Sequence, residues 1–560
     1  MQAEIRKAIE KVLTELGITG VDFVVERPAD ITHGDYATNV AMVSAKKLGK
    51  NPREIAEQFR ADCDGKIIHV ESITIAGPGF INFHLKRDFF KQQIEDILKK
   101  GELWGRNSIL SNEDIIFEYT SPNLFKPLHV GNLVGNIVGE SISRLFELGG
   151  ATVHRVNYPS DIGPTVAKGV WGLQKTGGDP SDINQIGEAY RVGNEAFEND
   201  PKAKEEIEVI NRALYAGNDE TLNTLRAKGI ATSRARLAEL CRILGTKFDT
   251  EIFESEVSEA GRQIVREQIA HGVFEESEGA FIFRGEKYGL HTRVFLNSQG
   301  LPTYEAKDLG NFALKTEKYP DWTQSFVVTG GEQREYFKVI IAAILEVFGG
   351  AKDKVIEHIP TGFLTLTTGK MSSRKGNVLT GESLLAEMEE EARKKAEESR
   401  ATDIDTLTEE VAVAALKYQI LRQAPGSNIV FDKEKALSFE GDSGPYLQYT
   451  HARIVSVLEK AKIVGVRPDT QVGPVEAYPI EKILYRFEEV VCEALTERAP
   501  HKVAVYLTEL AGAFNAFYGN EKIADVADDY APYKAAIADA VRITLKNGLW
   551  TLGIKAPERM

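Results

Sequence analysis

The stretch SPNLFKPLHVGN, residues 121–132, follows directly on the strand pattern IIFEYT, residues 115–120. Its two prolines oppose helix formation until Pro127 is passed. A helical pattern then covers residues 131–148 and ends at a pair of glycines, which commonly stop a helix. ATVHRVNY, residues 151–158, reads as a second strand. Strand, loop, helix and strand predict a βαβ unit, the beginning of a doubly wound parallel sheet of the Rossmann-like kind.

The position of this loop predicts a nucleotide site. In open α/β sheets, ligands bind beyond the carboxyl ends of strands, where helix N-termini offer free N–H groups. Gly131 lets a flat ring or a phosphate approach the backbone, because no Cβ stands in the way. His129 can donate to a phosphate oxygen, and Lys126 adds a positive charge three residues earlier. The alternative is a rigid loop with a capping histidine, since HxG is a short pattern.

A second loop later in the chain favours the nucleotide interpretation. TGFLTLTTGKMSSRKGN, residues 361–377, reads as a strand followed by a loop with Lys370, Arg374 and Lys375 among glycines and serines. Cations of this kind suit phosphoryl chemistry, in which negative charge develops in the transition state. A basic surface loop is the alternative. Two such loops in this order make that alternative the weaker one.

The segments around this region predict a multidomain α/β chain. Residues 1–105 read as a small α+β unit, with a helix that Gly17 ends, a second helix in HGDYATNVAMVSAKKLG and two strands in KIIHVESITIAGPGFINFHL. Residues 165–285 are polar and helical in period, which predicts an insertion that interrupts the sheet. Strand patterns return at TRVFLN and SFVVTG, and the latter leads into the helical KVIIAAILEVFG. From residue 384 onward the patterns are helical, with no strand alternation.

We therefore expect three domains: an N-terminal α+β domain over 1–105, a Rossmann-like catalytic domain over 106–383 and a helical bundle over 384–560. With 560 residues the chain is too long for one core. Hydrophobic residues make up 42% and charged residues 27%, as in ordinary globular proteins. No signal-peptide pattern or apolar run of spanning length occurs, so we expect a cytoplasmic protein.

Charge and cysteine content exclude some classes of protein. The net charge of −15 argues against non-specific coating of nucleic acid, although a local basic face remains compatible with it. Cys63, Cys241 and Cys492 lie far apart and form no CxxC pair. A disulfide framework or a cysteine-rich zinc site is therefore not expected, and we predict no metal ligands from the protein.

HVGN and KMSSR resemble the HIGH and KMSKS signatures of the class I aminoacyl-tRNA synthetases. Asn132 stands where the second histidine is usual, and Ser373 where the second lysine is usual. Either Lys126 or Lys375 could supply the charge that Ser373 lacks. The resemblance implies that magnesium accompanies ATP. It also implies catalytic roles for Lys126, His129, Asn132 and Lys370, and ATP contacts from Pro127, His129, Gly131, Asn132, Lys370, Met371, Ser372 and Ser373.

Several polar residues beside these loops suit a cationic amino acid. A guanidinium donates five N–H bonds and accepts none, so its site needs carboxylates and carbonyl acceptors. Glu118 and Asn123 flank the first loop, and Tyr304 and Asp308 share one face if their segment is helical. Gln333 follows a predicted strand. Each alone has a structural explanation, as a surface charge, a core aromatic or a helix-surface acid.

Together these residues are part of a longer match. FEYTSPN, KPLHVGN, PTYEAKDLG, VVTGGEQ, PYLQYTHARI and LWTLGIKAPERM resemble the arginyl-tRNA synthetases, and the similarity extends from HGDYATNVAM to the last residue. The resemblance implies that Glu118, Asn123, Tyr304, Asp308 and Gln333 hold arginine. It also implies ATP-dependent ligation of arginine to tRNA through an arginyl-adenylate, with release of AMP and pyrophosphate. Lysine lacks the guanidinium fork, so no editing domain is expected.

Aromatic residues on predicted helices and strands are candidates for contacts with tRNA. Tyr446 and Tyr449 are three apart and so share a helix face, and Tyr518 follows Phe517 in FNAFYGN. Such aromatics more often belong to a core, but the resemblance implies that this helical region binds the anticodon. In GFINFHL, Phe80 and Asn82 share one strand face, and an exposed Phe80 would suit stacking on a base. The resemblance implies that this N-terminal domain touches the outer corner of the tRNA.

Two other classes of protein remain as alternatives at this point. A small nucleotidyltransferase also uses HxGH, but it needs neither a helical tail of about 170 residues nor a separate N-terminal module. A non-catalytic, synthetase-like RNA-binding protein need not keep Glu118, His129 and Lys370. We expect a monomer. Whether activation of arginine requires bound tRNA is not decided by the sequence.

Overall fold

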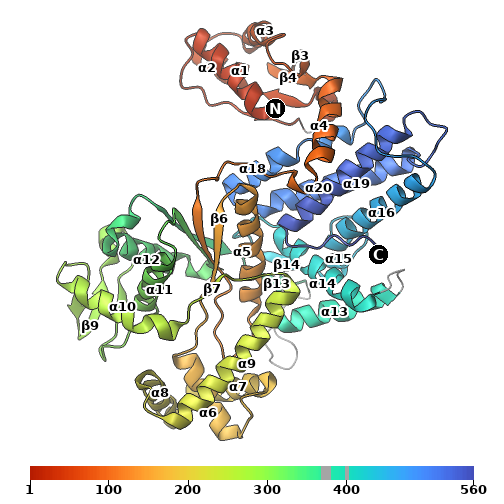
Figure 1. Cartoon of the computed structure of the whole chain (residues 1–560). Coiled ribbons are helices and arrows are strands. Elements are labelled where there is room, and N and C mark those ends of the chain that lie inside the picture. Colours follow the sequence, from red (N-terminus) through yellow and green to blue (C-terminus); the bar gives the residue numbers. More distant parts are fainter. Residues whose placement is uncertain (29, 368–379, 398–402) are drawn as a thin grey trace. The chain divides into compact units, whose positions relative to one another are not determined.

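The computed structural model of the chain describes residues 1–28, 30–367, 380–397 and 403–560 (Figure 1). These residues form two compact units. One unit contains residues 1–104, 454–489 and 509–544, and the other contains residues 105–453, 490–508 and 545–560. The prediction of an α/β multidomain fold is confirmed, whereas the three predicted domain boundaries stay predictions.

The second unit is built on a five-stranded sheet in which every neighbouring pair is parallel. Its strand order is β12-β11-β5-β6-β7. The strands are β5 (Asp114–Glu118), β6 (Thr152–Asn157), β7 (Thr250–Glu251), β11 (Gln324–Gly330) and β12 (Val355–Thr361). The chain adds strands on one side of β5 and then returns to add β11 and β12 on the other side. Such a reversal leaves a crevice at the carboxyl ends of the two central strands, here β5 and β11.

Helices cover both faces of this sheet (Figure 1). Helix α5 (Val130–Leu148) packs against β6 and β11 on one face, and α11 (Tyr304–Lys318) and α12 (Arg334–Val347) lie on the other. Ile115, Ile116 and Phe117 of β5 are fully buried. A strand covered on both faces reads as a continuous apolar run, which explains why the sequence predicted β5 without alternation.

The segment between β6 and β11 is mainly helical but also contributes strands. Besides β7 and α11, its helices and strands are α6 (Pro164–Thr176), α7 (Ile183–Asn199), α8 (Pro201–Ala216), α9 (Glu220–Leu244), α10 (Glu254–Ile269), β8 (Glu275–Ser277), β9 (Ala280–Phe283) and β10 (Arg293–Leu296). Helices α6 to α9 share a hydrophobic core of their own. The strand predicted in TRVFLN is confirmed as β10, but β10 pairs antiparallel with β9 in a separate three-stranded sheet and does not join the main sheet.

The N-terminal segment of the first unit is an α+β domain with a four-stranded antiparallel sheet of order β1-β2-β4-β3. Its elements are α1 (Gln2–Glu15), β1 (Val25–Glu26), β2 (Tyr36–Thr38), α2 (Val40–Leu48), α3 (Pro52–Cys63), β3 (Val70–Ala76), β4 (Phe80–Leu85) and α4 (Arg87–Lys100). The two predicted strands are confirmed as β3 and β4. The predicted helix in HGDYATNVAMVSAKKLG begins later than expected, because its first part is the buried strand β2.

Buried polar contacts join this domain to later segments of the same unit. Arg87 donates to Glu481 over 2.9 Å and to the Tyr533 hydroxyl over 2.7 Å, and Tyr533 in turn donates to Glu481. The Tyr36 hydroxyl donates to Glu489 over 2.8 Å. The first unit is therefore assembled from three separate stretches of the chain.

The C-terminal region is helical, as predicted, with one exception. Its helices are α13 (Gly381–Glu397), α14 (Ile404–Leu421), α15 (Lys433–Ala436), α16 (Gly444–Ile463), α17 (Glu481–Leu484), α18 (Phe487–Glu497), α19 (Pro500–Asn520) and α20 (Ala531–Thr551). The exception is β14 (Ile429–Phe431), which pairs parallel with β13 (Leu364–Leu366). A three-residue strand is too short to show alternation in the sequence.

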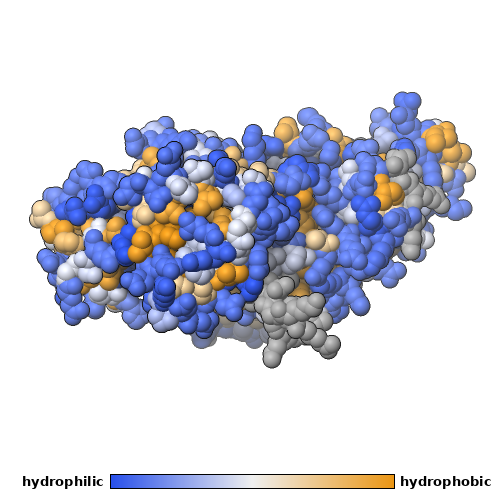
Figure 2. Space-filling model, turned by 90° about the horizontal axis from the view of Figure 1, so that it is seen from below, coloured by the Kyte–Doolittle hydropathy of each residue, from blue (hydrophilic) through white to orange (hydrophobic). Residues whose placement is uncertain are grey.

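The surface gives no sign of a membrane-spanning segment. Among the described residues, no helix is long and apolar enough to cross a membrane. The face drawn in Figure 2 is largely hydrophilic, with hydrophobic residues gathered in separate patches.

Candidate active site

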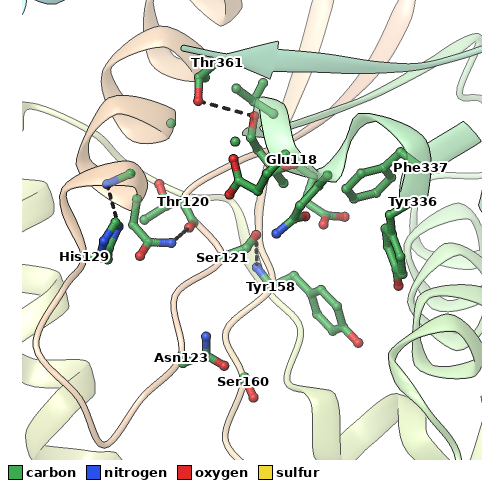
Figure 3. Close-up of a pocket in the computed structure, with 18 of the residues that line it drawn as sticks. Glu118, Thr120, Ser121, Asn123, His129, Tyr158, Ser160, Tyr336, Phe337 and Thr361 are labelled. Atoms are coloured by element: carbon green, nitrogen blue, oxygen red, sulfur yellow. Dashed lines mark hydrogen bonds between the residues drawn. The ribbon is translucent and has the colours of Figure 1, made fainter. Parts of the chain in front are cut away.

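A cavity of about 550 Å³ lies at the carboxyl ends of β5, β6 and β11 (Figure 3). The N-terminus of α5 and the first turns of α11 and α12 complete its wall. The cavity therefore lies where the strand order reverses, the position expected for a ligand in an open α/β sheet.

Most of the predicted substrate residues line this one cavity. They are Glu118, Asn123, Lys126, His129, Gly131, Asn132, Tyr304, Asp308 and Gln333. Pro127 is not among the lining residues. Lys370, Met371, Ser372 and Ser373, with Arg374 and Lys375, lie outside the described residues. The structure thus brings together residues that are more than two hundred positions apart in the sequence.

His129 caps α5 and faces the cavity at the same time. Its Nδ1 accepts a hydrogen bond from the Gly131 N–H over 3.0 Å. Partial burial and the positive charge of Lys126 lower the pKa of His129. The neutral ring therefore carries its proton on Nε2, which leaves one N–H donor for a ligand. The two sequence interpretations of this residue, a capping histidine and a ligand contact, are compatible.

Asn132 supports the end of β5. Its Nδ2 donates to the Thr120 carbonyl oxygen over 2.8 Å, and Asn136 Nδ2 donates to Thr120 Oγ1 over 2.9 Å. Thr120 has a φ of +75°, and Ser121 a φ of +38°. A β-branched residue rarely adopts a positive φ, so the two amides hold a strained backbone in place. Asn132 keeps a second amide hydrogen that can donate to a ligand.

Glu118 is buried, and its charge is already paired. It is 4% exposed, and its Oε2 accepts hydrogen bonds from Lys315 Nζ and Asn311 Nδ2, each over 2.9 Å. Both partners lie on α11. This arrangement could not be predicted from the sequence, because nearly two hundred residues separate Glu118 from Lys315.

Two further acids in the cavity wall also have cationic partners. Lys307 Nζ lies 2.8 Å from Glu254 Oε2, with both side chains buried. Arg293 Nη1 lies 3.2 Å from Glu305 Oε1. These pairs compensate the negative charge of the two glutamates within the wall.

Asp308 differs from these acids, because it forms no ion pair with any described residue. The Tyr336 hydroxyl donates to its Oδ2 over 2.6 Å. Burial, together with the negative charges of Glu118 and Glu254, raises the pKa of Asp308 to about 8. A bound cation would lower that pKa again, because it stabilises the ionised carboxylate. The cavity is therefore built to accept a positively charged group at Asp308.

Tyr304 and Lys126 lie at the outer wall of the cavity. The ring of Tyr304 is exposed, and Lys307 Nζ lies 5.2 Å from its centroid. Lys126 Nζ lies 5.9 Å from the ring centroid of Tyr190 in α7. Burial and the nearby charge of Lys168 lower the pKa of Lys126.

The predicted tRNA contacts lie away from the cavity lining and differ in exposure. Tyr449 is 37% exposed and Tyr518 is 39% exposed, while Tyr446 is half-buried. Phe80 is half-buried, and Asn82, in the strand β4 that pairs with both β2 and β3, is only 5% exposed. The tyrosines are therefore better placed than Asn82 to meet a base.

Family models match the chain along most of its length. The model of the catalytic domain of class I tRNA synthetases (R) matches residues 93–433. The chain belongs to the class I arginyl-tRNA synthetases. Models of the arginyl-tRNA synthetase N-terminal domain and of the DALR anticodon-binding domain match residues 1–85 and 447–560. As an arginyl-tRNA synthetase, the chain has arginine–tRNA ligase activity, and the ligases of this class use ATP.

Arginyl-tRNA synthetases from distant organisms resemble the whole chain. The arginine–tRNA ligase of Limosilactobacillus reuteri is 31% identical, over 100% of this chain and 99% of the relative. That of Archaeoglobus fulgidus is 29% identical over 99% of both. The arginyl-tRNA synthetase structure from Thermus thermophilus superposes with a TM-score of 0.79 at 26% identity, over 100% of both chains.

The described residues provide no ready-made metal site. No group of three or more His, Cys, Asp or Glu side chains among them could hold a metal ion. In nucleotide sites, Mg²⁺ commonly takes most of its ligands from phosphates and water. A magnesium ion that arrives with ATP would therefore need few ligands from the cavity wall.

Proposed function

We propose that the cavity at β5 and β11 activates arginine with ATP and then passes the arginyl group to tRNA. The observation that carries this proposal is Asp308, a carboxylate that forms no ion pair with any described residue in a wall where three glutamates do. The guanidinium of arginine is the cation that fits there. It stays charged at every pH at which the protein is folded.

The side chain and head group of arginine contact different parts of the wall. The guanidinium donates to Asp308 and to the carboxylate of Glu118, and Tyr304 and Gln333 lie beside it. Asn123 is bridged to Ser160 at the opposite side of the cavity and binds the head group of the amino acid. The ammonium group of lysine is a single point charge, so it cannot form the two parallel hydrogen bonds that a guanidinium forms with a carboxylate.

ATP lies against the N-terminus of α5. Gly131 offers its open backbone, while His129 Nε2–H and the second amide hydrogen of Asn132 donate to phosphate oxygens. Pro127, Lys370, Met371, Ser372 and Ser373 complete the proposed ATP site. Lys126 lines the cavity and is our candidate for the charge that Ser373 lacks. Magnesium, bound mainly by the phosphates, neutralises part of their charge.

The reaction needs no nucleophile from the protein. A carboxylate oxygen of arginine attacks the α-phosphorus of ATP, and pyrophosphate leaves, which gives arginyl-adenylate. A ribose hydroxyl of the terminal tRNA adenosine then attacks the arginyl carbonyl carbon, and AMP leaves. The site contributes by orienting the reactants and by stabilising charge on the phosphate.

The tRNA contacts, the cellular location and the oligomeric state are also part of the proposal. Tyr446, Tyr449 and Tyr518 contact the anticodon arm, and Phe80 and Asn82 contact the outer corner of the tRNA. The enzyme acts in the cytoplasm as a monomer.

ATP–pyrophosphate exchange tests the proposed site. The wild-type chain, supplied with tRNA(Arg), should exchange with arginine and not with lysine or citrulline. Glu118→Gln should raise the arginine KM at least tenfold and leave the ATP KM nearly unchanged, because loss of a buried charge contact typically costs about 2–5 kcal/mol.

A second variant separates arginine binding from folding. In Glu118→Gln, Lys315 stays buried without its carboxylate, which costs about 3–5 kcal/mol of stability. Glu118→Gln/Lys315→Met should regain stability in a thermal melt but keep the high arginine KM. An arginine KM within threefold of wild type in the double variant would remove Glu118 from the arginine site.

A further inference from the structure

The loop that carries Asn123 and Lys126 is anchored in the helical insertion. Phe125, between these two residues, is 0% exposed. Its ring belongs to the hydrophobic core of α6 to α9, together with Val166, Val170 and other residues of those helices. The Phe125 N–H donates to Ser233 Oγ of α9 over 3.3 Å.

Two glycines make the space that the Phe125 ring occupies. A Cβ on Gly169 of α6 would lie 2.6 Å from Phe125 Cδ1, and a Cβ on Gly229 of α9 would lie 2.2 Å from Phe125 Cζ. Neither position tolerates a side chain while the ring is in place. Glycine inside a helix weakens the helix, so two interior glycines against one ring indicate that this contact is specific.

The backbone around Phe125 is strained. Phe125 has a φ of +67°, in the left-handed region that a bulky side chain rarely adopts. Such a conformation persists only where the surroundings impose it. Here the surroundings are the ring slot formed by Gly169 and Gly229, and the contact of the N–H with Ser233.

The same loop is tied to the cavity on its other side. Leu124 N–H donates to the Ser160 carbonyl oxygen over 3.0 Å, and Ser160 N–H donates to the Pro122 carbonyl oxygen over 2.9 Å. Asn123 lies between these bonds. The loop is therefore fixed between the segment after β6 and the insertion, and the ring of Phe125 is its attachment to the insertion.

We propose that Phe125 is a positioning residue, which sets the geometry of Asn123 and Lys126 by inserting its ring between Gly169 and Gly229. The inference deepens the proposed function, because it makes the insertion a determinant of arginine binding. A displacement of α6 relative to α9 would move the ring, and the ring would move the arginine-binding loop.

The test places a methyl group in the ring slot. Gly229→Ala should expel the ring, raise the arginine KM about tenfold through Asn123 and lower kcat through Lys126, although Gly229 does not line the cavity. Phe125→Leu should do the same. In Phe125→Leu/Gly229→Ala the methyl group meets a smaller side chain. The rise in the arginine KM should therefore be smaller than the product of the rises measured for the two single variants.

Gly217→Ala is the matched control. Gly217 ends α8 with a φ of +63°, and an added Cβ would meet no atom within 4 Å, so this variant strains the same insertion without pressing on Phe125, α6 or α9. It should lower the melting temperature and leave the arginine KM unchanged. Equal arginine KM changes in Gly229→Ala and Gly217→Ala, or an unchanged KM in Gly229→Ala, would overturn the inference. If wild type failed to exchange with arginine, the proposed function itself would fail.

Discussion

At the scale of single residues, the cavity distributes its charges unequally. Glu118, Glu254 and Glu305 each have a lysine or arginine within 3.2 Å, whereas Asp308 has the Tyr336 hydroxyl. A buried carboxylate without a cation is costly to ionise, and its pKa rises. The positive charge of a bound arginine therefore stabilises the ionised Asp308 more than it would stabilise a carboxylate that already has a cationic partner.

The pH dependence of arginine use should follow Asp308. Its pKa of about 8 describes the cavity before arginine binds, so below pH 8 binding must release a proton. The arginine kcat/KM should rise about tenfold per pH unit up to about pH 8 and then level off. Exchange rates measured between pH 6 and 9 check this. Asp308→Asn should abolish the slope, and Tyr336→Phe should shift the bend to higher pH, because the hydroxyl stabilises the carboxylate.

Stability should respond to the same group with a defined sign. The pKa of Asp308 in the folded chain lies above the ordinary value near 4. Between about pH 4 and 8, folding is therefore accompanied by the uptake of a proton at Asp308. The contribution of Asp308 to stability is present below this window and is lost as the pH rises through 8. Asp308→Asn should flatten this part of a melting-temperature profile. A wild-type profile as flat as that of the variant would contradict the assigned pKa.

The sequence predicted the residues of the cavity better than their partners. Glu118, Asn123, His129, Tyr304, Asp308 and Gln333 were all predicted, and all line one cavity. Lys315 and Tyr336 were not, because a lysine on an amphipathic helix and a tyrosine in an apolar run look like surface and core residues. Only the packing of α11 against β5 shows that Lys315 points at Glu118.

At the scale of elements, the N-terminus of α5 performs two tasks with one side chain. His129 satisfies the Gly131 N–H and also presents its other nitrogen to the cavity. These two tasks can be separated by substitution, because asparagine is a good N-cap residue but has no equivalent of the Nε2–H.

His129→Asn should preserve the stability of α5 but lower the rate of adenylate formation. Its melting temperature should stay near that of wild type, whereas His129→Ala should lose about 0.5–2 kcal/mol. Both variants should lower kcat for adenylate formation roughly a hundredfold, as expected when one donor to developing charge is removed. Single-turnover kinetics and a thermal melt together check both parts. If Asn restored the rate as well, capping alone would explain the histidine.

Strands that were not predicted from the sequence are either very short or interrupted by polar residues and proline. β7 and β14 are two and three residues long, too short for a hydrophobic period. β12 was missed because Glu357, His358 and Pro360 interrupt its apolar residues, although it is a full edge strand beside β11. Edge strands tolerate such residues, since one side of their backbone needs no partner strand. The central strand β5 was predicted because burial on both faces makes its three middle residues apolar.

At the scale of the whole molecule, contacts far from the cavity should affect charging without affecting the chemistry. Tyr449 of α16 is exposed, and Arg453 lies 4.7 Å from its ring centroid. An exposed ring with a cation over one face resembles the platforms on which bases stack.

Tyr449→Ala should weaken charging of full-length tRNA(Arg). Loss of one stacking platform is worth roughly 1–3 kcal/mol, or about tenfold to a hundredfold in affinity. A minihelix without the anticodon arm should be charged equally by variant and wild type. The measurement is a paired charging assay with a thermal melt. Equal losses on both RNAs, or an early melt, would place Tyr449 in the core instead.

The first unit also sets an order of events during synthesis of the chain. The N-terminal α+β domain has a core of its own, to which later segments add Tyr485. Arg87, however, meets Glu481 only after 394 further residues have been translated, and Tyr533 only after 446. At about 5–20 residues per second, that interval is roughly 20–90 seconds. During that interval the surface of the N-terminal domain that contacts these segments faces water, and α20, which carries Tyr533, covers it after the other segments.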